Sequence, residues 1–266
     1  MRNRGHSCAR DYATSVLPPM FMEQKGVSMT NRYRNAIVGA AITILVVVAI
    51  GWSIGPAVIH HYQGDLIYYT ERHLYLVGCS MSLALLCGIP AGILLSRPYF
   101  TRHAEKWMQL FNIGNTIPSM AVLALALALF GIGDKPAIIA LWLASLLPIV
   151  RNTYEGLKQV SPSMKEAAKG IGLKPLQVLF RVELPNALPI IVGGVRTALA
   201  INVGTAPLAV LIGGESLGGL IFPGIYLNNQ DLLLLGATAT AVLALALDAI
   251  VSLGSNAYLS KRGLLR

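Results

Sequence analysis

Long apolar blocks separated by short polar segments dominate the pattern of this chain. A bilayer core about 30 Å thick needs about 20 helical residues to cross it. Pro136–Val150 is shorter than this, and we expect its helix either to extend over Asn152 and Thr153 or to lie in a thin part of the protein. The pattern predicts about six transmembrane helices. Their blocks are Ala36–Ile59, Leu74–Leu95, Trp107–Gly133, Pro136–Val150, Ala187–Gly214 and Leu232–Ser255.

The apolar residues favour helices over strands, because they occupy both odd and even positions within the blocks. A membrane-spanning strand would need strict alternation and a closed barrel. Only 12% of the residues are charged, against about a quarter in a soluble domain. This composition excludes a disordered chain, a fibrous repeat and an ordinary cytosolic enzyme. The predicted fold class is an all-α polytopic membrane protein.

The distribution of positive charge predicts the orientation. The segments between blocks alternate between rich and poor in Lys and Arg, with 18 such residues in one set and 2 in the other. Because Lys and Arg concentrate on the cytoplasmic side, both termini are predicted to lie in the cytoplasm. The net charge of +9 then indicates loops facing anionic lipid rather than a nucleic-acid partner.

Three regions follow from this pattern. Residues 1–35 are polar and are expected to form a disordered cytoplasmic tail, or to include a start codon placed too early, with Met22 or Met29 as the true start. Residues 36–255 form the transmembrane domain. Residues 256–266 form a short cytoplasmic tail.

The segment between the fourth and fifth blocks holds two short predicted helices. Ser161 is a suitable N-cap and Pro162 a suitable first residue for one of them, with Ser163 and Glu166 as an alternative capping box. Gly170 and Gly172 are expected to end it. A helix this short is marginal in water, so it must dock on something. The second helix is expected to open at Pro175 and stop before Pro185, with Leu176, Leu179 and Phe180 on one face.

This segment resembles the EAA loop of the permease subunits of binding-protein-dependent ABC importers. Glu166-Ala167-Ala168, Gly172 and Val182-Glu183-Leu184-Pro185 match its spacing without a gap, with Val182 in place of the usual Ile. The resemblance implies an ABC importer permease fold whose cytoplasmic coupling loop, residues 154–185, sits in a groove of the ATP-binding subunit. The residues implied to couple are Glu166, Ala167, Ala168, Gly172, Leu184 and Pro185. The alternative is an interfacial amphipathic helix without a partner.

Further motifs are similar to the glycine betaine, carnitine and choline branch of that family, which imports osmoprotectants. They are Gly114-Asn-Thr-Ile-Pro-Ser119, Leu147-Pro-Ile-Val-Arg-Asn-Thr153, Gly194-Val-Arg-Thr-Ala198, Gly204-Thr-Ala206 and Ile212-Gly-Gly-Glu-Ser-Leu-Gly-Gly-Leu-Ile221. The chain departs from the branch at Asn115, at Pro207 and at Glu215, which lies in a turn usually made of Gly and Ala.

The resemblance also implies the partners. The sequence contains no Gly-x-x-x-x-Gly-Lys-Ser/Thr motif, so we expect no ATP site, no cofactor and no enzymatic activity of its own. Two separate ATP-binding subunits, a solute-binding protein that is periplasmic or lipid-anchored, and a second permease, identical or paralogous, are the implied partners. The implied location is the bacterial inner membrane. No His or Cys spacing predicts a metal site.

Charged residues and helix breakers within the blocks are candidate functional features. Arg196 and Asp248 lie at similar predicted depths, so an ion pair is the favoured interpretation and a cation-repelling Arg in the pathway is the alternative. Pro90, Pro118, Gly204 and Pro207 are candidate helix breaks lining a pathway; simple kinks are the alternative reading.

Other functions remain open at this point. The permease could carry another small solute such as an amino acid. An ion-coupled secondary transporter would need intramembrane carboxylates and inverted halves, and only Asp248 fits the first requirement. A membrane scaffold would not need the coupling loop.

Overall fold

The structure is a computed structural model that describes residues 54–100 and 117–261, together with Val48, Ala49, Gly51, Lys106 and Gln109. The predicted tail 1–35, most of the first predicted span and most of residues 107–116 lie outside the described residues. Asn115 also lies outside the described residues. The total of six spans therefore stays a prediction.

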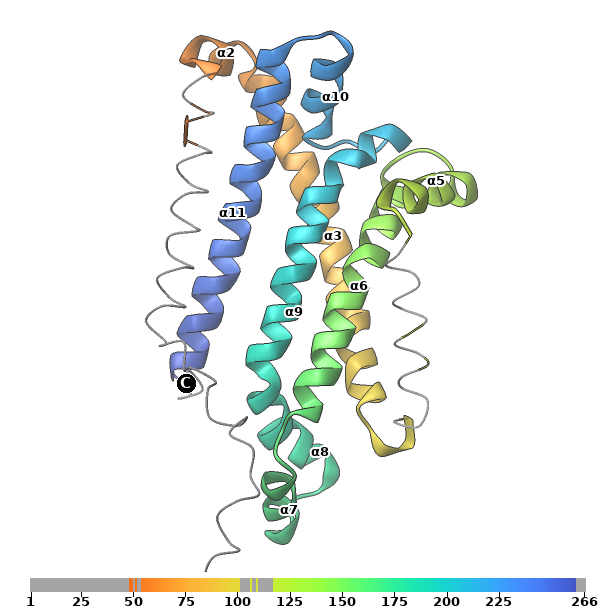
Figure 1. Ribbon diagram of the computed structural model, residues 1–266, viewed down its shortest axis with the longest axis vertical. Coiled ribbons are helices and arrows are strands. Elements are labelled where there is room, and N and C mark those ends of the chain that lie inside the picture. Colours follow the sequence, from red (N-terminus) through yellow and green to blue (C-terminus); the bar gives the residue numbers. More distant parts are fainter. Residues whose placement is uncertain are drawn as a thin grey trace, which may run out of the picture. The chain divides into compact units, whose positions relative to one another are not determined.

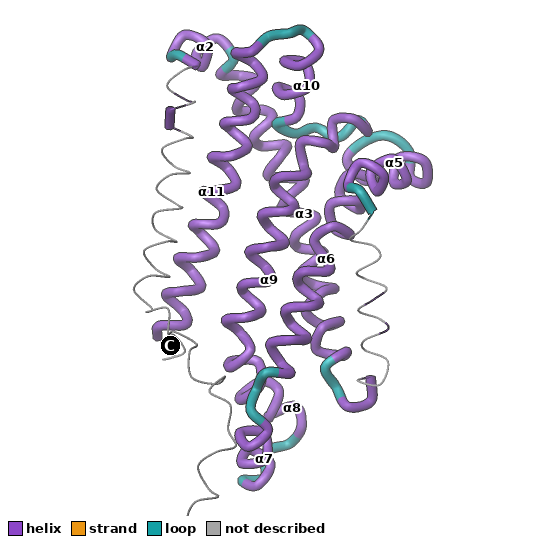
Figure 2. The backbone as a smooth tube through the Cα atoms, viewed as in Figure 1, coloured by secondary structure: helices purple, strands orange, loops and turns teal. Residues whose placement is uncertain are grey.

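Every regular element of the described residues is a helix (Figures 1 and 2). The elements in chain order are α2 (Pro56–His61), α3 (Gln63–Leu95), α5 (Ser119–Phe130), α6 (Asp134–Lys158), α7 (Pro162–Gly170), α8 (Pro175–Val178), the π-helix η1 (Leu179–Glu183), α9 (Leu184–Thr205), the 3₁₀-helix η2 (Ala206–Ile212), α10 (Gly218–Tyr226) and α11 (Gln230–Lys261).

Four helical stretches of the described residues are long and apolar enough to cross a membrane: Gln63–Leu95, Asp134–Lys158, Pro175–Ile212 and Gln230–Ser260. All four extend beyond the apolar blocks of the sequence, because a helix continues through polar residues once its backbone hydrogen bonds are made. The short fourth block thus becomes the 25-residue α6. Ser119–Phe130, in the third block, is a shorter apolar helix.

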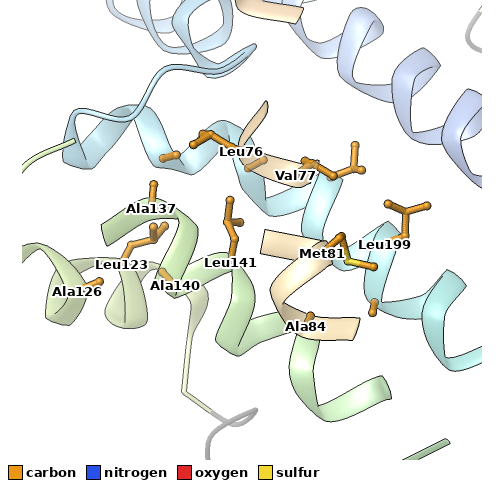
Figure 3. Packing of buried hydrophobic residues seen from close by; sticks show 14 of the residues in the cluster. Leu76, Val77, Met81, Ala84, Leu123, Ala126, Ala137, Ala140, Leu141 and Leu199 are labelled. Atoms are coloured by element: carbon orange, nitrogen blue, oxygen red, sulfur yellow. The ribbon is translucent and has the colours of Figure 1, made fainter. Parts of the chain in front are cut away.

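Helices α3, α6 and α9 pack around a common core (Figure 3). Leu76 and Val77 of α3, Leu141 of α6 and Leu199 of α9 are among its buried residues. Glycines allow close contacts between these helices, as is common in membranes. A Cβ on Gly194 of α9, for example, would lie only 2.8 Å from a backbone oxygen of α6.

A buried polar cluster also joins the three central helices. The side-chain amide of Asn202 in α9 donates to the Ser80 hydroxyl of α3 at 2.9 Å and to the Ser145 hydroxyl of α6 at 2.7 Å. All three side chains are fully buried. Because a buried polar group without a partner is costly, the cluster favours one register of the three helices over others.

The segment after Pro175 departs from its predicted form. We expected a helix that stops before Pro185, but α8 passes through the π-turn η1 directly into α9. Pro185 lies in the first turn of α9, where its missing N–H is tolerated. The wider π-turn accommodates the change of hydrogen-bonding partners, so the proline does not interrupt the helix.

Helix α11 continues to Lys261, beyond the predicted end of the last span at Ser255. It packs against α9 and α10. Figure 1 shows α7 and α8 at one end of the bundle and α10 at the other. The two ends therefore carry different candidate sites.

Candidate functional site

The candidate coupling loop begins with α7, whose first residues stand where they were expected. Ser161 is the N-cap and Pro162 the first helical residue. The Ser161 hydroxyl, however, lies 2.7 Å from the Ser163 hydroxyl rather than capping a backbone N–H. Because α7 already starts at Pro162, Ser163 lies inside the helix and does not begin a capping box with Glu166.

The end of α7 is a sharp reversal centred on Gly172. Gly172 has a φ of +84°, a left-handed conformation that favours glycine. Its N–H donates to the Lys169 carbonyl at 2.9 Å, and the Leu173 N–H donates to the Ala168 carbonyl at 3.2 Å. This pair of bonds is a Schellman motif with glycine at the C′ position. Gly170, the other predicted terminator, is the last residue of the helix.

The residues of the Glu-Ala-Ala motif point in different directions. Glu166 and Ala167 are exposed, so they are available to another protein. Ala168 is only 5% exposed, and α7 contacts α8 and η1 of its own chain. Its small side chain therefore serves the packing of the loop itself. The two alanines, which the sequence does not distinguish, occupy different surroundings.

A small apolar cluster lies between the loop and the ends of α6 and α9. It consists of Leu157, Val160, Leu179, Ala187 and Ile191, with Leu184 packed against it. Leu184 and Pro185 are half-buried. Both belong to the first turn of α9, and Leu184 joins this turn to the cluster.

Three exposed apolar side chains near α7 were not recognised as a site from the sequence. Ile171 is 79% exposed, Leu176 68% and Phe180 63%. The sequence placed Leu176 and Phe180 on one face with Leu179, but Leu179 is buried.

A cavity of about 380 Å³ lies between α5, α6 and α9. Its lining includes Ile117 and Ser119, which flank Pro118, and Thr205, which follows Gly204. The described lining residues are apolar apart from Ser119 and Thr205. Two of the predicted helix breaks, Pro118 and Gly204, are therefore adjacent in sequence to residues that line this cavity.

The candidate helix breaks differ in form. Helix α3 continues through Pro90 without interruption, so no break occurs there, and Pro90 is absent from the described lining of the cavity. Pro118 is the N-cap of α5. After Gly204, α9 gives way to the 3₁₀-helix η2, in which Pro207 is buried. A proline interior to a helix can be accommodated by a bend alone.

Arg196 and Asp248 lie in contact between α9 and α11. Arg196 Nε donates to Asp248 Oδ1 at 2.8 Å, and Arg196 Nη2 donates to Asp248 Oδ2 at 2.7 Å. The geometry is a bidentate guanidinium–carboxylate pair. The pair neutralises two charges inside the spans.

A second charged cluster lies at the end of the bundle opposite α7. Arg72 of α3 pairs with Asp134 at the start of α6 and, through Nε at 2.9 Å, with Glu215 before α10. The Tyr68 hydroxyl donates to Glu215 at 2.6 Å. We did not predict this cluster; the unusual acidic residue at position 215 is the only sequence signal that pointed to it.

The comparisons with known proteins decide the family. The family model described as the inner membrane component of binding-protein-dependent transport systems matches residues 88–263. The chain belongs to this permease family. The match includes α6, the whole candidate coupling loop, and α9 through α11.

Two curated members of the permease family illustrate the similarity. The chain is 58% identical over 217 residues to the osmoprotectant import permease protein OsmY of Salmonella typhimurium, covering 81% of this chain and 92% of the relative. It is 39% identical over 189 residues to the glycine betaine/carnitine/choline transport system permease protein OpuCB of Bacillus subtilis, covering 71% and 86%.

Solved ABC transporters share the fold. An inward-facing structure of the MetNI methionine ABC transporter matches with a TM-score of 0.62 at 23% identity, covering 77% of this chain and 98% of the matched one. An amino acid ABC transporter matches with a TM-score of 0.61 at 16% identity, covering 74% and 96%. The predicted fold class, an all-α membrane permease, is confirmed.

Proposed function

We propose that this chain is the membrane-spanning permease subunit of an ATP-driven importer of small osmoprotectants. The observation that carries the proposal is α7: a short helix with Glu166 and Ala167 exposed, closed by Gly172 and held at one end of the spanning bundle. A helix of nine residues gains little stability by itself, so a partner surface is the natural use of its free face.

The partners follow from the family. Two ATP-binding subunits supply the hydrolysis, because the sequence has no phosphate-cradling Gly-x-x-x-x-Gly-Lys-Ser/Thr motif. A solute-binding protein delivers the substrate. A second permease, either another copy or a paralogue, completes the pathway. Lipid surrounds the spans, and no nucleic acid takes part.

The substrate class is glycine betaine, carnitine, choline or a similar quaternary amine. The names of OsmY and OpuCB support it, and so do the identities of 58% and 39%. The similarity to methionine and amino acid transporters is too low in identity to support an amino acid substrate.

The protein resides in the bacterial inner membrane with both termini in the cytoplasm. The end of the bundle with α7 carries Lys158, Lys165, Lys169, Lys174 and Arg181. Because positive residues concentrate on the cytoplasmic side, this end faces the cytoplasm, where the ATP-binding subunits are.

The cavity between α5, α6 and α9 is the candidate pathway surface. Pro118 and Gly204 flank residues of its lining, and the 3₁₀-helix with Pro207 continues from the same helix. Interrupted helices at membrane depth are tolerated where they line a cavity, because the freed backbone groups can then be satisfied. Arg196 and Asp248 have a structural role outside this cavity.

Reconstitution tests the proposal. The chain is co-expressed with its ATP-binding subunit and binding protein, purified, and placed in lipid vesicles with labelled glycine betaine. We expect uptake that requires ATP, and co-purification of two ATP-binding subunits per pair of permeases. Uptake of an amino acid with no uptake of betaine would refute the substrate class. Uptake driven by an ion gradient without ATP would refute the transporter class.

A further inference from the structure

Glu183 is a buried carboxylate with two cationic partners from two different segments. Its side chain is 8% exposed. Arg97, two residues after the end of α3, donates from Nη2 to Glu183 Oε2 at 2.6 Å. Lys165 of α7 places its ammonium 3.7 Å from Glu183 Oε1. A carboxylate at such a site is stable in its charged form only while it keeps its partners.

The two links differ in kind. The Arg97 contact is a short, charge-assisted hydrogen bond. The Lys165 contact is longer than a hydrogen bond and is an electrostatic attraction between charges. Lys165 also donates to the Leu157 carbonyl near the end of α6 at 3.0 Å. The shorter contact therefore joins Glu183 to the segment that follows α3, and the longer contact joins it to α7.

The position of Glu183 in the chain gives these links a mechanical consequence. It is the last residue of the π-turn η1, and α9 starts at the next residue. Lys165 directly precedes Glu166, which is exposed on α7. One buried carboxylate thus connects the exposed helix, the end of α3 and the beginning of α9.

We infer that Glu183 is a positioning residue that transmits the displacement of α7 to α3 and α9 during transport. The inference rests on the proposed function, because it requires that an ATP-binding subunit moves α7. When α7 shifts, Lys165 carries its charge relative to Glu183, and the carboxylate follows because the two opposite charges attract each other at a poorly hydrated site. Arg97 and the first turn of α9 then move with it. The wider π-turn lets this region shift without loss of all its backbone bonds.

The test compares transport with ATP consumption in the reconstituted complex. Glu183→Gln keeps the shape of the side chain and can still accept a hydrogen bond from Arg97, but it loses the charge that attracts Lys165. We expect normal amounts of assembled complex and ATP hydrolysis still stimulated by the binding protein. The ATP hydrolysed per betaine transported should rise roughly ten-fold, within the usual range of coupling between sites.

Lys165→Met is the second variant, because it removes the charge from α7 and leaves the Arg97–Glu183 bond intact. It should raise the same ratio. The double variant should raise the ATP hydrolysed per betaine no further than either single variant, since both changes remove the attraction between Glu183 and Lys165. A merely structural role would instead lower the amount of complex and leave the ratio unchanged in the complex that remains. Glu71→Gln, an exposed carboxylate of α3 outside the coupling loop, is the matched control and should leave the ratio unchanged.

Two results would overturn the inference. One is a wild-type ratio in both Glu183→Gln and Lys165→Met. The other is loss of Glu183→Gln from the membrane together with a wild-type ratio in Lys165→Met, which would make Glu183 a folding residue. Failure of the proposed function has a different signature, because the wild-type complex itself would then show no ATP-dependent uptake of betaine.

Discussion

Gly92 of α3 lies against Thr153 of α6 so closely that a Cβ on Gly92 would come within 2.5 Å of the Thr153 Cβ atom. The same added atom would lie 2.8 Å from the Val150 carbonyl oxygen. Neither a β-branched side chain at its Cβ nor a backbone carbonyl can rotate away. The absence of a side chain at position 92 therefore sets how closely these two helices approach.

Gly92→Ala should destabilise the purified protein by about 1–3 kcal/mol, as is usual for overpacking. The measurement is the free energy or midpoint of unfolding in detergent. Gly78→Ala is the matched control, because it is in the same helix and an added Cβ there meets nothing within 4 Å. It should be neutral or stabilising by up to about 1 kcal/mol, since alanine is the better helix former. Equal effects of the two changes would show that the α3–α6 contact is looser than described.

The Arg196–Asp248 pair can be tested by removing one charge or both. Asp248→Asn alone leaves Arg196 without its carboxylate within the spans, at a cost of about 2.5–3.5 kcal/mol for a charge near the bilayer centre. We expect lower amounts of protein in the membrane. The double change Arg196→Leu with Asp248→Leu should restore both the amount and the uptake of betaine. Normal amounts without uptake in the double variant would support the alternative role of Arg196 in the pathway.

The exposed face of α7 gives a prediction about the ATP-binding subunit. Ala167→Trp should keep the permease in the membrane and weaken binding of the subunit by ten-fold or more, because hot-spot contacts are worth about 2 kcal/mol or more. A pull-down with tagged subunit measures this. Ala168→Trp should act differently, because this side chain is buried within the chain: the loop itself should lose its structure and become sensitive to protease. Undisturbed binding by Ala167→Trp would show that this face of α7 is not the docking surface.

Gly172→Val should disrupt the end of α7. Its φ of +84° is a conformation that β-branched residues rarely adopt, and holding a non-glycine residue there costs on the order of 1–3 kcal/mol. Steric contact with neighbouring atoms does not cause this cost, because a Cβ at this position meets nothing within 4 Å. We expect normal membrane insertion with reduced transport, and Gly172→Asn, which tolerates the left-handed region better, should be milder. Similar losses in both variants would indicate that the glycine matters for contact with a partner instead of for the turn.

The orientation is tested by fusing a reporter that is active only outside the cytoplasm after Arg266. The distribution of Lys and Arg predicts that this fusion is silent. A fusion within the turn around Glu215, between η2 and α10, should be active and serves as the positive control. Activity at Arg266 together with activity at Glu215 would place both ends of α11 on one side and contradict the six-span arrangement; activity at Arg266 alone would contradict the predicted orientation.

Local sequence was sufficient for several features of the protein. The apolar blocks located the helices, because the bilayer imposes both a length and a composition. The motif around Glu166 located the candidate coupling loop, and Gly172 marked the turn that ends α7, because a left-handed residue is a local backbone requirement. Similar depths in the bilayer were enough to suggest the contact between Arg196 and Asp248, since a charge in a span needs a partner.

Tertiary structure decided what depends on neighbours distant in the chain. Ala167 and Ala168 are equivalent in the motif. The packing of α7 on α8 and η1 buries Ala168 and leaves Ala167 exposed. The contact of Glu183 with Arg97 joins residues 86 positions apart, which helical periodicity does not relate. Pro90 illustrates the same limit, because α3 continues through it whereas the sequence alone left both a break and a simple kink open. Periodicity and turn chemistry act over a few residues, whereas the face that a helix buries depends on which other helices pack against it.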